Sequence, residues 1–554
     1  MFHNDLSYPF LSRRRSLYAK RGIVGSTHPV ASEAGLYILR QGGNAVDAAI
    51  AMATTLSVVE PNANGIGGDN FAIIWFDGKM YGLNSSGPAP MALNIEALER
   101  KGFDKMPEFG WESVTVPGAP AGWKALSDRF GKLPFEKLFG PAVDAAEGGV
   151  ALTGDVGPSI QKVADIYMST LSADLVKPFL DTFARQGDGS SVLSTDNKTK
   201  EPSPCLVGDV YKLPYHAKAL RSIAETGAES FYRGEISDAI VEFSQKTGGY
   251  FSPEDLAVFK PEWVEPISVN YRGYDVWEIP PNGQGLCALI ALNIVKGYEF
   301  SPDSFGTTRT FHLQFEAMKL AFADAAKHIA DPKYMEFSIK DLLGDVYAAD
   351  RRSLINESAL EPFPGTPNKG GTVYFAAADG DGNMVSMIQS NYAGFGSGLV
   401  VPGWGVALHN RAANFSFEKG HVNALAGGKR PYHTIIPGFL TKDNSPIGPF
   451  GVMGGFMQPQ GHLQVVMNTV DFHMNPQSAL DAPRFCWKQG KNIDIENTID
   501  QKVFDELSAK GHMLTLVDPA VSNPFGRGQI IWKTDAGTYC GGTEPRGDGC
   551  MYGY

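Results

Sequence analysis

The sequence has few cysteines and no long apolar run, and both absences limit the classes of protein to which it can belong. Its five cysteines among 554 residues are an odd number and include no Cys-x-x-Cys pair, so neither a disulfide framework nor a zinc site is predicted. No stretch of about 18 consecutive apolar residues occurs, so we expect no membrane span. Residues 1–22 lack the apolar run of a signal peptide, which predicts a cytoplasmic location.

Acidic residues outnumber basic residues, and the sequence lacks the motifs of common cofactor and metal sites. Lys and Arg total 48 against 60 Asp and Glu, giving a net charge of −12, which argues against nucleic acid as a partner. The glycine-rich run at 65–68 lacks the Lys-Ser/Thr of a P-loop and the GxGxxG spacing. A loop that begins like an EF-hand at Asp379 has Met384 and Ser390 where Gly and Glu are required. We therefore predict no cofactor and no metal.

The composition is that of a compact protein with many turns, because 43% of residues are hydrophobic and 63 are glycine. The length suggests two or more domains, or one large core that uses the whole chain. Residues 31–61 read as helical with a break at 42–43 and Asn44 as an N-cap, residues 64–71 as a loop, and residues 72–76 as a strand. Residues 311–329 predict a core helix whose apolar face excludes Lys319 and Asp324. Periodicity thus indicates mixed α and β structure.

The most informative stretch runs from Lys369 to Gly398. Apolar residues 373–378, the turn sequence Asp-Gly-Asp-Gly-Asn at 379–383, and residues 384–390 predict a β-hairpin. Two glycines, Gly370 and Gly371, precede Thr372 at its start.

Thr372 is a candidate nucleophile. A threonine hydroxyl needs a base, and its own α-amino group can serve once the preceding peptide bond is cut. Flexible glycines before it would let the backbone bend for that cut. An ordinary strand start has the same pattern, so spacing alone leaves both interpretations open.

Several segments resemble the γ-glutamyltranspeptidase family, whose members are N-terminal-nucleophile hydrolases. The hairpin resembles the start of the family's small subunit, and the matches extend over about residues 21–554. They include GGNAVDAAIA at 42–51, NGIGGDNF at 64–71, PPNGQG at 280–285 and EPRGDGCMYGY at the end of the chain. The resemblance implies an α+β fold, a four-layer αββα sandwich. It also implies self-cleavage between Gly371 and Thr372 into a large chain, 1–371, and a small chain, 372–554, which stay associated as one αββα unit.

The resemblance also implies the chemistry of the site. The freed α-amino group, with a reference pKa of about 8, would activate Thr372, and the acyl part of a small amide substrate would pass through an ester to water or an amine. Gly454 and Gly455 match paired glycines whose N–H groups hold the oxyanion, and Ser390 matches a hydroxyl residue that steadies the nucleophile. From the residues alone, a Gly-Gly pair is also typical of a turn, and a lone serine of a cap.

The chain departs from the family where γ-glutamyl transferases hold a free amino acid. Asn84 stands in place of an arginine that binds the α-carboxylate, and Arg411 and Asn414 stand where an acid binds the α-amino group. The family's serine pair is replaced by His433 and Thr434. The residues that we expect to contact substrate are Asn84, Arg411, Asn414, Tyr432, His433 and Thr434.

These departures predict an acyl group that lacks the α-amine. An ammonium would be repelled by Arg411, whereas a carboxylate could form a bidentate pair with it; the alternative is that Arg411 forms a structural salt bridge. The segment 415–429 is short, which predicts an open site. The function we expect is a self-processing amidohydrolase or acyltransferase acting on a γ-glutamyl or related amide. The alternatives are a glutaryl- or cephalosporin-type acylase, an oxamate-type amidohydrolase, and an uncut, inactive binding scaffold.

Overall fold

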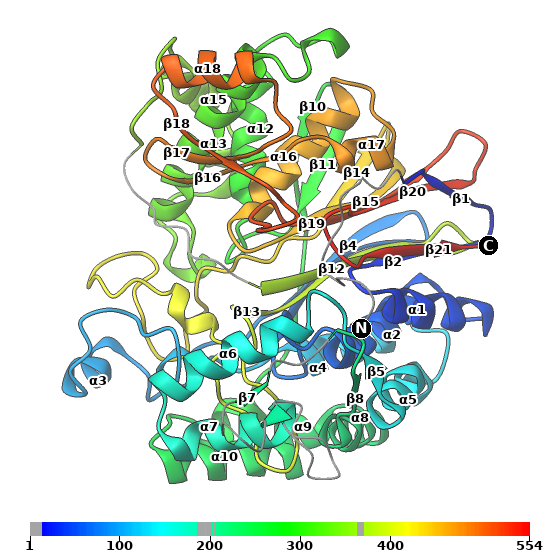
Figure 1. Ribbon diagram of the computed structural model, residues 1–554, viewed down its shortest axis with the longest axis vertical. Coiled ribbons are helices and arrows are strands. Elements are labelled where there is room, and N and C mark those ends of the chain that lie inside the picture. The colour runs from blue at the N-terminus through cyan, green and yellow to red at the C-terminus, as the bar shows by residue number, and fades with distance from the viewer. Residues whose placement is uncertain (1–13, 185–193, 196–201, 204–206, 363–370) are drawn as a thin grey trace.

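The computed structural model describes residues 14–184, 194–195, 202–203, 207–362 and 371–554. Two seven-stranded sheets stack face to face, and helices cover the outer face of each (Figure 1). The predicted four-layer αββα sandwich is therefore confirmed. Among the described helices, none is both long and apolar enough to cross a bilayer.

The first sheet contains the predicted hairpin at its centre. Its strands, all antiparallel, follow the order β21-β2-β12-β13-β3-β4-β9. The hairpin is formed by β12 and β13, which confirms the prediction from the apolar residues on either side of the Asp-Gly-Asp-Gly-Asn turn. The strands are β21 (Cys550–Gly553), β2 (Ile23–Ser26), β12 (Gly371–Ala378), β13 (Met384–Tyr392), β3 (Asp69–Phe76), β4 (Lys79–Ser85) and β9 (Glu262–Val264).

The second sheet faces the first across a core of apolar side chains that belong to both. The sheets approach closely where Gly451 lies against the ring of Tyr374, and a Cβ at Gly451 would come within 2.4 Å of that ring. Its strands, in order, are β1 (Leu17–Ala19), β20 (Tyr539–Thr543), β19 (Arg527–Lys533), β15 (Ser445–Met453), β14 (Gly438–Lys442), β11 (Tyr274–Glu278) and β10 (Ile267–Tyr271).

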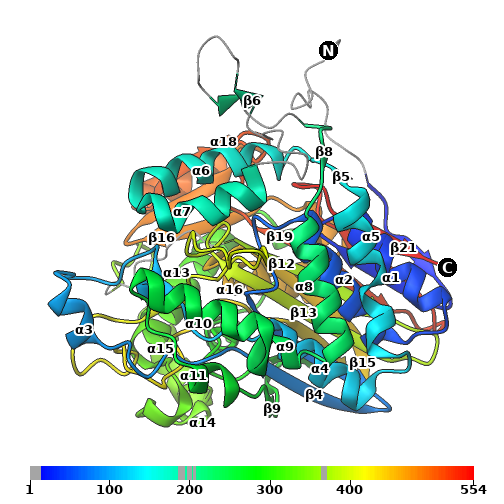
Figure 2. The same ribbon diagram turned by 90° about the horizontal axis from the view of Figure 1, so that it is seen from below.

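Helices α1 and α2 pack on the outer face of the first sheet and confirm the helical interpretation of residues 31–61. Asn44 caps α2 through a capping box with Asp47. β3 begins at Asp69, so the predicted loop at 64–71 ends earlier than expected. Figure 2 shows the helices of this side from below. They are α1 (Pro29–Arg40), α2 (Ala45–Val59), α4 (Ala119–Phe130), α5 (Gly140–Gly148), α8 (Pro214–Thr226), α9 (Glu229–Arg233), α10 (Glu235–Thr247) and α11 (Pro253–Ala257).

Helices α12 and α13 pack together on the side of the second sheet. The interpretation of α13 as a core helix is confirmed, but Lys319 and Asp324, placed off its apolar face, are buried as well. The elements of this side are α12 (Gly285–Val295), α13 (Thr308–His328), α14 (Ile339–Leu342), α15 (Asp345–Ser353), α16 (Met457–Val470), α17 (Pro476–Asp481), α18 (Gln501–Ala509), β16 (Phe485–Gln489), β17 (Asn492–Glu496) and β18 (Met513–Val517).

The remaining elements are short or peripheral. They are α3 (Ile95–Arg100), α6 (Gly157–Thr170), α7 (Ala173–Phe179), β5 (Val150–Ala151), β6 (Ser194–Thr195), β7 (Pro202–Ser203), β8 (Val210–Tyr211), and the single turns Trp111–Ser113, Phe135–Phe139, Leu180–Ala184, Pro302–Ser304, Pro332–Tyr334 and Arg411–Asn414. Gly370, the first of the two glycines before Thr372, lies outside the described residues.

Candidate active site

Thr372 lies at the start of β12, in the middle of the first sheet. Gly371 pairs with Tyr392 on β13, and the register shifts between Gly371 and Val373, so Thr372 occupies an irregularity of the ladder. Its side chain is buried, and its Oγ1 lies 3.1 Å from Ser390 Oγ. The structure thus brings together the predicted nucleophile and the hydroxyl predicted to steady it.

Two donors among the described residues form hydrogen bonds to Ser390 Oγ. The backbone N–H of Tyr392 donates at 2.8 Å and Arg411 Nη2 donates at 3.2 Å. Because a hydroxyl oxygen has two lone pairs, these bonds leave the Ser390 O–H to act as a donor, and Thr372 Oγ1 is an acceptor within reach. Tyr392 takes up a left-handed backbone conformation, with φ 76°, which is uncommon for a residue that has a side chain.

Arg411 is a fully buried cation, held by hydroxyl groups. Its Nη1 donates to Thr434 Oγ1 at 2.7 Å, and its guanidinium lies 4.7 Å from the centre of the Tyr392 ring. No carboxylate of the described residues forms an ion pair with Arg411, and its Nε has no hydrogen-bond acceptor there. Burial lowers the pKa of Arg411 to about 10, against the attraction of Asp69. Among the described residues Arg411 thus forms no direct ion pair, and its contact with substrate stays a prediction.

Asp69 supplies the nearby negative charge. It begins β3 directly opposite Ser390 in the ladder and accepts a hydrogen bond from the N–H of Gly118 at 3.0 Å. His433 Nδ1 accepts from the N–H of Ile435, so the neutral ring donates through Nε2 to Asp69 at 2.9 Å. Burial raises the pKa of Asp69 to about 7, and it lowers that of His433 well below its usual range, helped by Arg411. The buried charges of Asp69 and Arg411 thus lie in one polar cluster.

Gly454 and Gly455 connect the end of β15 to α16. Their φ angles, 132° and 60°, lie in the region that favours glycine. No described residue accepts a hydrogen bond from the N–H of either glycine. Both N–H groups thus have no acceptor among the described residues, and their role as oxyanion donors stays a prediction.

Gln284 connects these glycines to the rest of the site. Its Nε2 donates to the carbonyl oxygens of Gly455 at 2.9 Å and Thr434 at 2.6 Å, while its Oε1 accepts from Tyr432 Oη at 3.1 Å. Since Thr434 also accepts from Arg411, an unbroken series of hydrogen-bonded residues leads from Gly455 to the nucleophile. Its members, in order, are Gly455, Gln284, Thr434, Arg411, Ser390 and Thr372.

Two predicted substrate contacts lie beside this series. Asn84 is buried, donates to Asn282 Oδ1 at 2.9 Å and accepts from Ser86, so its amide is engaged within the protein. Asn414 is partly buried, and its Nδ2 has no partner among the described residues. The roles of both residues stay predictions. Thr372 and Ser390 are buried in the uncut chain, and the open site stays a prediction.

Asp69, Gln284 and Tyr392 were not singled out from the sequence. Asp69 lies in NGIGGDNF and Gln284 in PPNGQG, two of the segments on which the resemblance rests. Buried polar residues of such glycine-rich loops would have been reasonable candidates. No motif around Tyr392 points to a role in the site, because its contact with Arg411 forms only in the folded chain.

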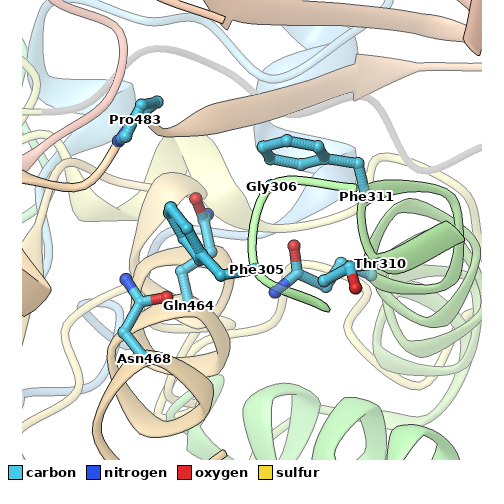
Figure 3. A pocket seen from close by; sticks show the side chains of 8 residues that line it. Phe305, Gly306, Thr310, Phe311, Gln464, Asn468 and Pro483 are labelled. Atoms are coloured by element: carbon cyan, nitrogen blue, oxygen red, sulfur yellow. The ribbon is translucent and has the colours of Figure 1, made fainter. Parts of the chain in front are cut away.

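A small cavity lies elsewhere, between α16 and the start of α13 (Figure 3). Its volume of about 10 Å³ has room for about one water molecule. None of the predicted site residues lines it. Its lining residues are Phe305, Gly306, Thr310, Phe311, Gln314, Gln464, Asn468 and Pro483.

A threonine at the start of a central strand of an αββα sandwich is the arrangement of the N-terminal-nucleophile hydrolases that use threonine. The solved structure of cephalosporin acylase from Bacillus halodurans is similar over 100% of this chain and 99% of that chain, with 53% sequence identity and a TM-score of 0.93. The protein is therefore an enzyme of this class.

The chain belongs to the γ-glutamyltranspeptidase family, because the family model described as "Gamma-glutamyltranspeptidase" matches residues 31–554. It is 32% identical to the Glutathione hydrolase-like YwrD proenzyme of Bacillus subtilis (strain 168), over 97% of this chain and 99% of the relative. It is also 32% identical to the Acylase ACY 1 proenzyme of Pseudomonas sp. (strain SE83), over 98% of this chain and 95% of the relative.

Proposed function

We propose that this enzyme cuts its own chain before Thr372 and then hydrolyses a small amide whose acyl part carries a carboxylate. In the first reaction Thr372 Oγ1 attacks the carbonyl carbon of Gly371, and the peptide nitrogen leaves as the α-amino group of Thr372. Water then hydrolyses the resulting ester, which gives Gly371 a carboxylate and restores the threonine hydroxyl. Both similar sequences named above are proenzymes, which supports this step.

The second reaction uses the new amino group. It takes the proton of Thr372 Oγ1 as this oxygen attacks the substrate carbonyl, and it gives a proton to the departing amine. The oxyanion is held by the N–H groups of Gly454 and Gly455, and Ser390 donates to the nucleophile oxygen. Water or a second amine then takes the acyl group from Thr372. The two chains stay associated, because each sheet contains strands from both sides of the cut.

Arg411 is the observation that carries the substrate assignment. A fully buried guanidinium without a carboxylate partner among the described residues has bonding capacity for an anion. It donates to Ser390, the neighbour of the nucleophile, so a carboxylate bound to it would lie close to the reacting carbonyl. A short diacid amide, of the glutaryl or oxamate kind, has this arrangement of groups.

A γ-glutamyl amide also carries a carboxylate, but its ammonium would lie near a cation. Charge repulsion therefore favours the acyl group without the amine. The similarity to a cephalosporin acylase at 53% identity supports an enzyme that hydrolyses an amide bond. Hydrolysis of γ-glutamyl amides is the second candidate, because the family description and the YwrD relative both point to it. A cytoplasmic location stays a prediction.

Intact mass of the purified protein tests the proposal first, with Thr372→Ala beside the wild type. We expect two wild-type chains that divide before Thr372, and one whole mutant chain. The cut protein is then given glutaryl, γ-glutamyl and pentanoyl amides of one chromogenic amine. Release of the amine from the glutaryl amide above the other two supports the proposal. A wild type that stays whole and inactive would overturn it in favour of the uncut scaffold, and equal rates on all three amides would overturn the role of the carboxylate.

A further inference from the structure

Four buried polar side chains, His312, Glu316, Lys319 and His512, form a cluster that the proposed chemistry does not use. The first three follow one face of α13 at i, i+4 and i+7, and His512 lies just before β18. All four are buried, with exposed fractions of 4%, 0%, 0% and 3%. Buried groups of this kind need partners, so the hydrogen bonds of the cluster decide what it does.

The two imidazoles form a directed pair. His312 Nε2 lies 2.7 Å from the carbonyl oxygen of Asn356 and must donate to it. His312 Nδ1 is then an acceptor, so His512 Nε2, at 2.8 Å, carries a proton and donates. His512 Nδ1 in turn is an acceptor, and Lys319 Nζ lies 3.5 Å from it. Both rings are therefore neutral, and each of their nitrogens has a partner.

Lys319 and Glu316 hold Leu360 by both of its backbone groups. Lys319 Nζ donates to the Leu360 carbonyl at 3.1 Å and to Glu316 Oε1 at 2.8 Å. Glu316 Oε2 accepts from the Leu360 N–H at 3.0 Å. With the bond from His312 to Asn356, the cluster binds the backbone at both ends of residues 356–360.

A metal ion would compete with a complete set of bonds. Ligand atoms of His312, Glu316 and His512 lie within 4.8 Å of one another, which is a spacing that metal sites share. The ammonium of Lys319 already bonds to Glu316 and lies next to His512, however, and the pair it forms with Glu316 is electrically neutral. A cation entering here would have to displace that ammonium against its repulsion. The cluster is better suited to holding the backbone than to holding an ion.

Residues 356–360 and the cluster that binds them lie on both sides of the proposed cut when they are taken together. They belong to the large side of the proposed cut, as do the three residues of α13, whereas His512 lies on the small side. The small side adds a second contact, because the N–H of Ala359 donates to the carbonyl of Lys510 at 2.8 Å. Only two more described residues, 361 and 362, follow this segment before the chain continues towards Gly371.

We propose that His312, Glu316, Lys319 and His512 form a latch that holds residues 356–360 between the two future chains, so that the end of the large chain is positioned for self-cleavage and stays bound to the small chain afterwards. This inference rests on the proposed cut before Thr372. The latch is a positioning device, since none of its residues contacts Thr372 in the described structure.

The test compares Lys319→Met with the double variant Glu316→Gln/Lys319→Met. The single variant leaves an unpaired buried carboxylate and is expected to lower the melting temperature, whereas the double variant removes both charges and is expected to recover most of it. Leu360 still lacks its lysine donor in the double variant. We therefore expect backbone amides of residues 356–361 to exchange hydrogen at least about tenfold faster than in the wild type, and self-cleavage to slow by a similar factor.

The control is His462→Gln, which disturbs another buried acid–histidine pair, with Glu278, and touches no residue of 356–360. It is expected to change stability without changing exchange at 356–361. A double variant with wild-type exchange and wild-type cleavage would overturn the latch and leave the cluster a purely stabilising role. If the wild type is never cut, the proposed function fails by itself, and hydrogen exchange at 356–361 still decides whether the cluster holds the segment.

Discussion

Arg411 donates a hydrogen bond to Ser390 Oγ at 3.2 Å, and Ser390 Oγ lies 3.1 Å from Thr372 Oγ1, so a buried cation lies one hydroxyl away from the nucleophile. This relationship joins the binding of an acidic acyl group to the orientation of the nucleophile. A change at any of the three residues should therefore affect a distinct kinetic quantity.

Ser390→Ala removes the hydroxyl that contacts Thr372. We expect kcat on the preferred amide to fall about tenfold to a hundredfold, the worth of one hydrogen bond to a developing charge, with little change in KM. Self-cleavage should slow as well. Ser390→Thr keeps the hydroxyl and is the matched control, measured by steady-state kinetics and by the time course of cutting. An alanine variant as fast as the threonine variant would exclude a role for this hydroxyl.

Arg411→Gln removes the cation but keeps a hydrogen-bond donor. We expect KM for the glutaryl amide to rise about tenfold to a hundredfold, because a charge-assisted hydrogen bond is lost. KM for the uncharged pentanoyl amide should change much less. Arg233→Gln serves as control, since Arg233 is an exposed residue paired with Glu229. Equal effects of Arg411→Gln on both amides would contradict the assignment.

The raised pKa of Asp69 predicts that substrate binding depends on pH. The raised pKa of about 7 means that Asp69 loses its charge as the pH falls from 8 to 6. Arg411 then has less negative charge near it and attracts a substrate carboxylate more strongly, so KM for the glutaryl amide should fall about threefold to tenfold at the lower pH. Asp69→Asn keeps the size of the side chain and an oxygen for His433.

KM of the Asn variant should be low at both pH values. The pentanoyl amide provides the matched substrate, for which no such trend is expected in either protein. A trend with pH that persists in Asp69→Asn would assign it to another group.

Gly454→Ala tests the oxyanion donors. Its φ of 132° is strained for any residue with a Cβ, and that Cβ would lie 3.1 Å from the Cα of Gly526. We expect the N–H to turn and kcat to fall about a hundredfold or more, with a smaller effect on KM. Gly420→Ala is the control, because Gly420 has φ 90° but open space around it. A comparable loss of activity in the control would show that backbone strain alone explains the result.

The hairpin and the first two helices illustrate what local pattern predicts well. Apolar residues on either side of the turn at 379–383 indicate β12 and β13, and Asn44 marks the start of α2. The αββα arrangement was inferred from resemblance and not from periodicity, since a period of 2 or 3.6 says nothing about how layers stack.

The partners of charged side chains were the least predictable features. Arg411 was given a salt bridge as one alternative, whereas in the structure it donates to two hydroxyl groups. Lys319 was placed off the apolar face of its helix, which suits a solvated lysine, yet it is buried against Glu316 and a histidine 193 residues away. Only the packing of α13 against α18, against the residues that follow α18 and against the segment at 356–360 brings such groups together.

The sequence by itself determined the class of fold, the hairpin with Thr372 at its start, and the family, because these depend on short-range pattern and on the order of motifs along the chain. The tertiary structure alone decided which polar groups meet: Asp69 opposite Ser390, Gln284 between Thr434 and Gly455, and Arg411 beside the nucleophile. The physical reason is that a hydrogen bond depends on distances of about 3 Å between atoms. Pairing between strands and stacking of sheets bring residues from distant parts of the chain within that distance.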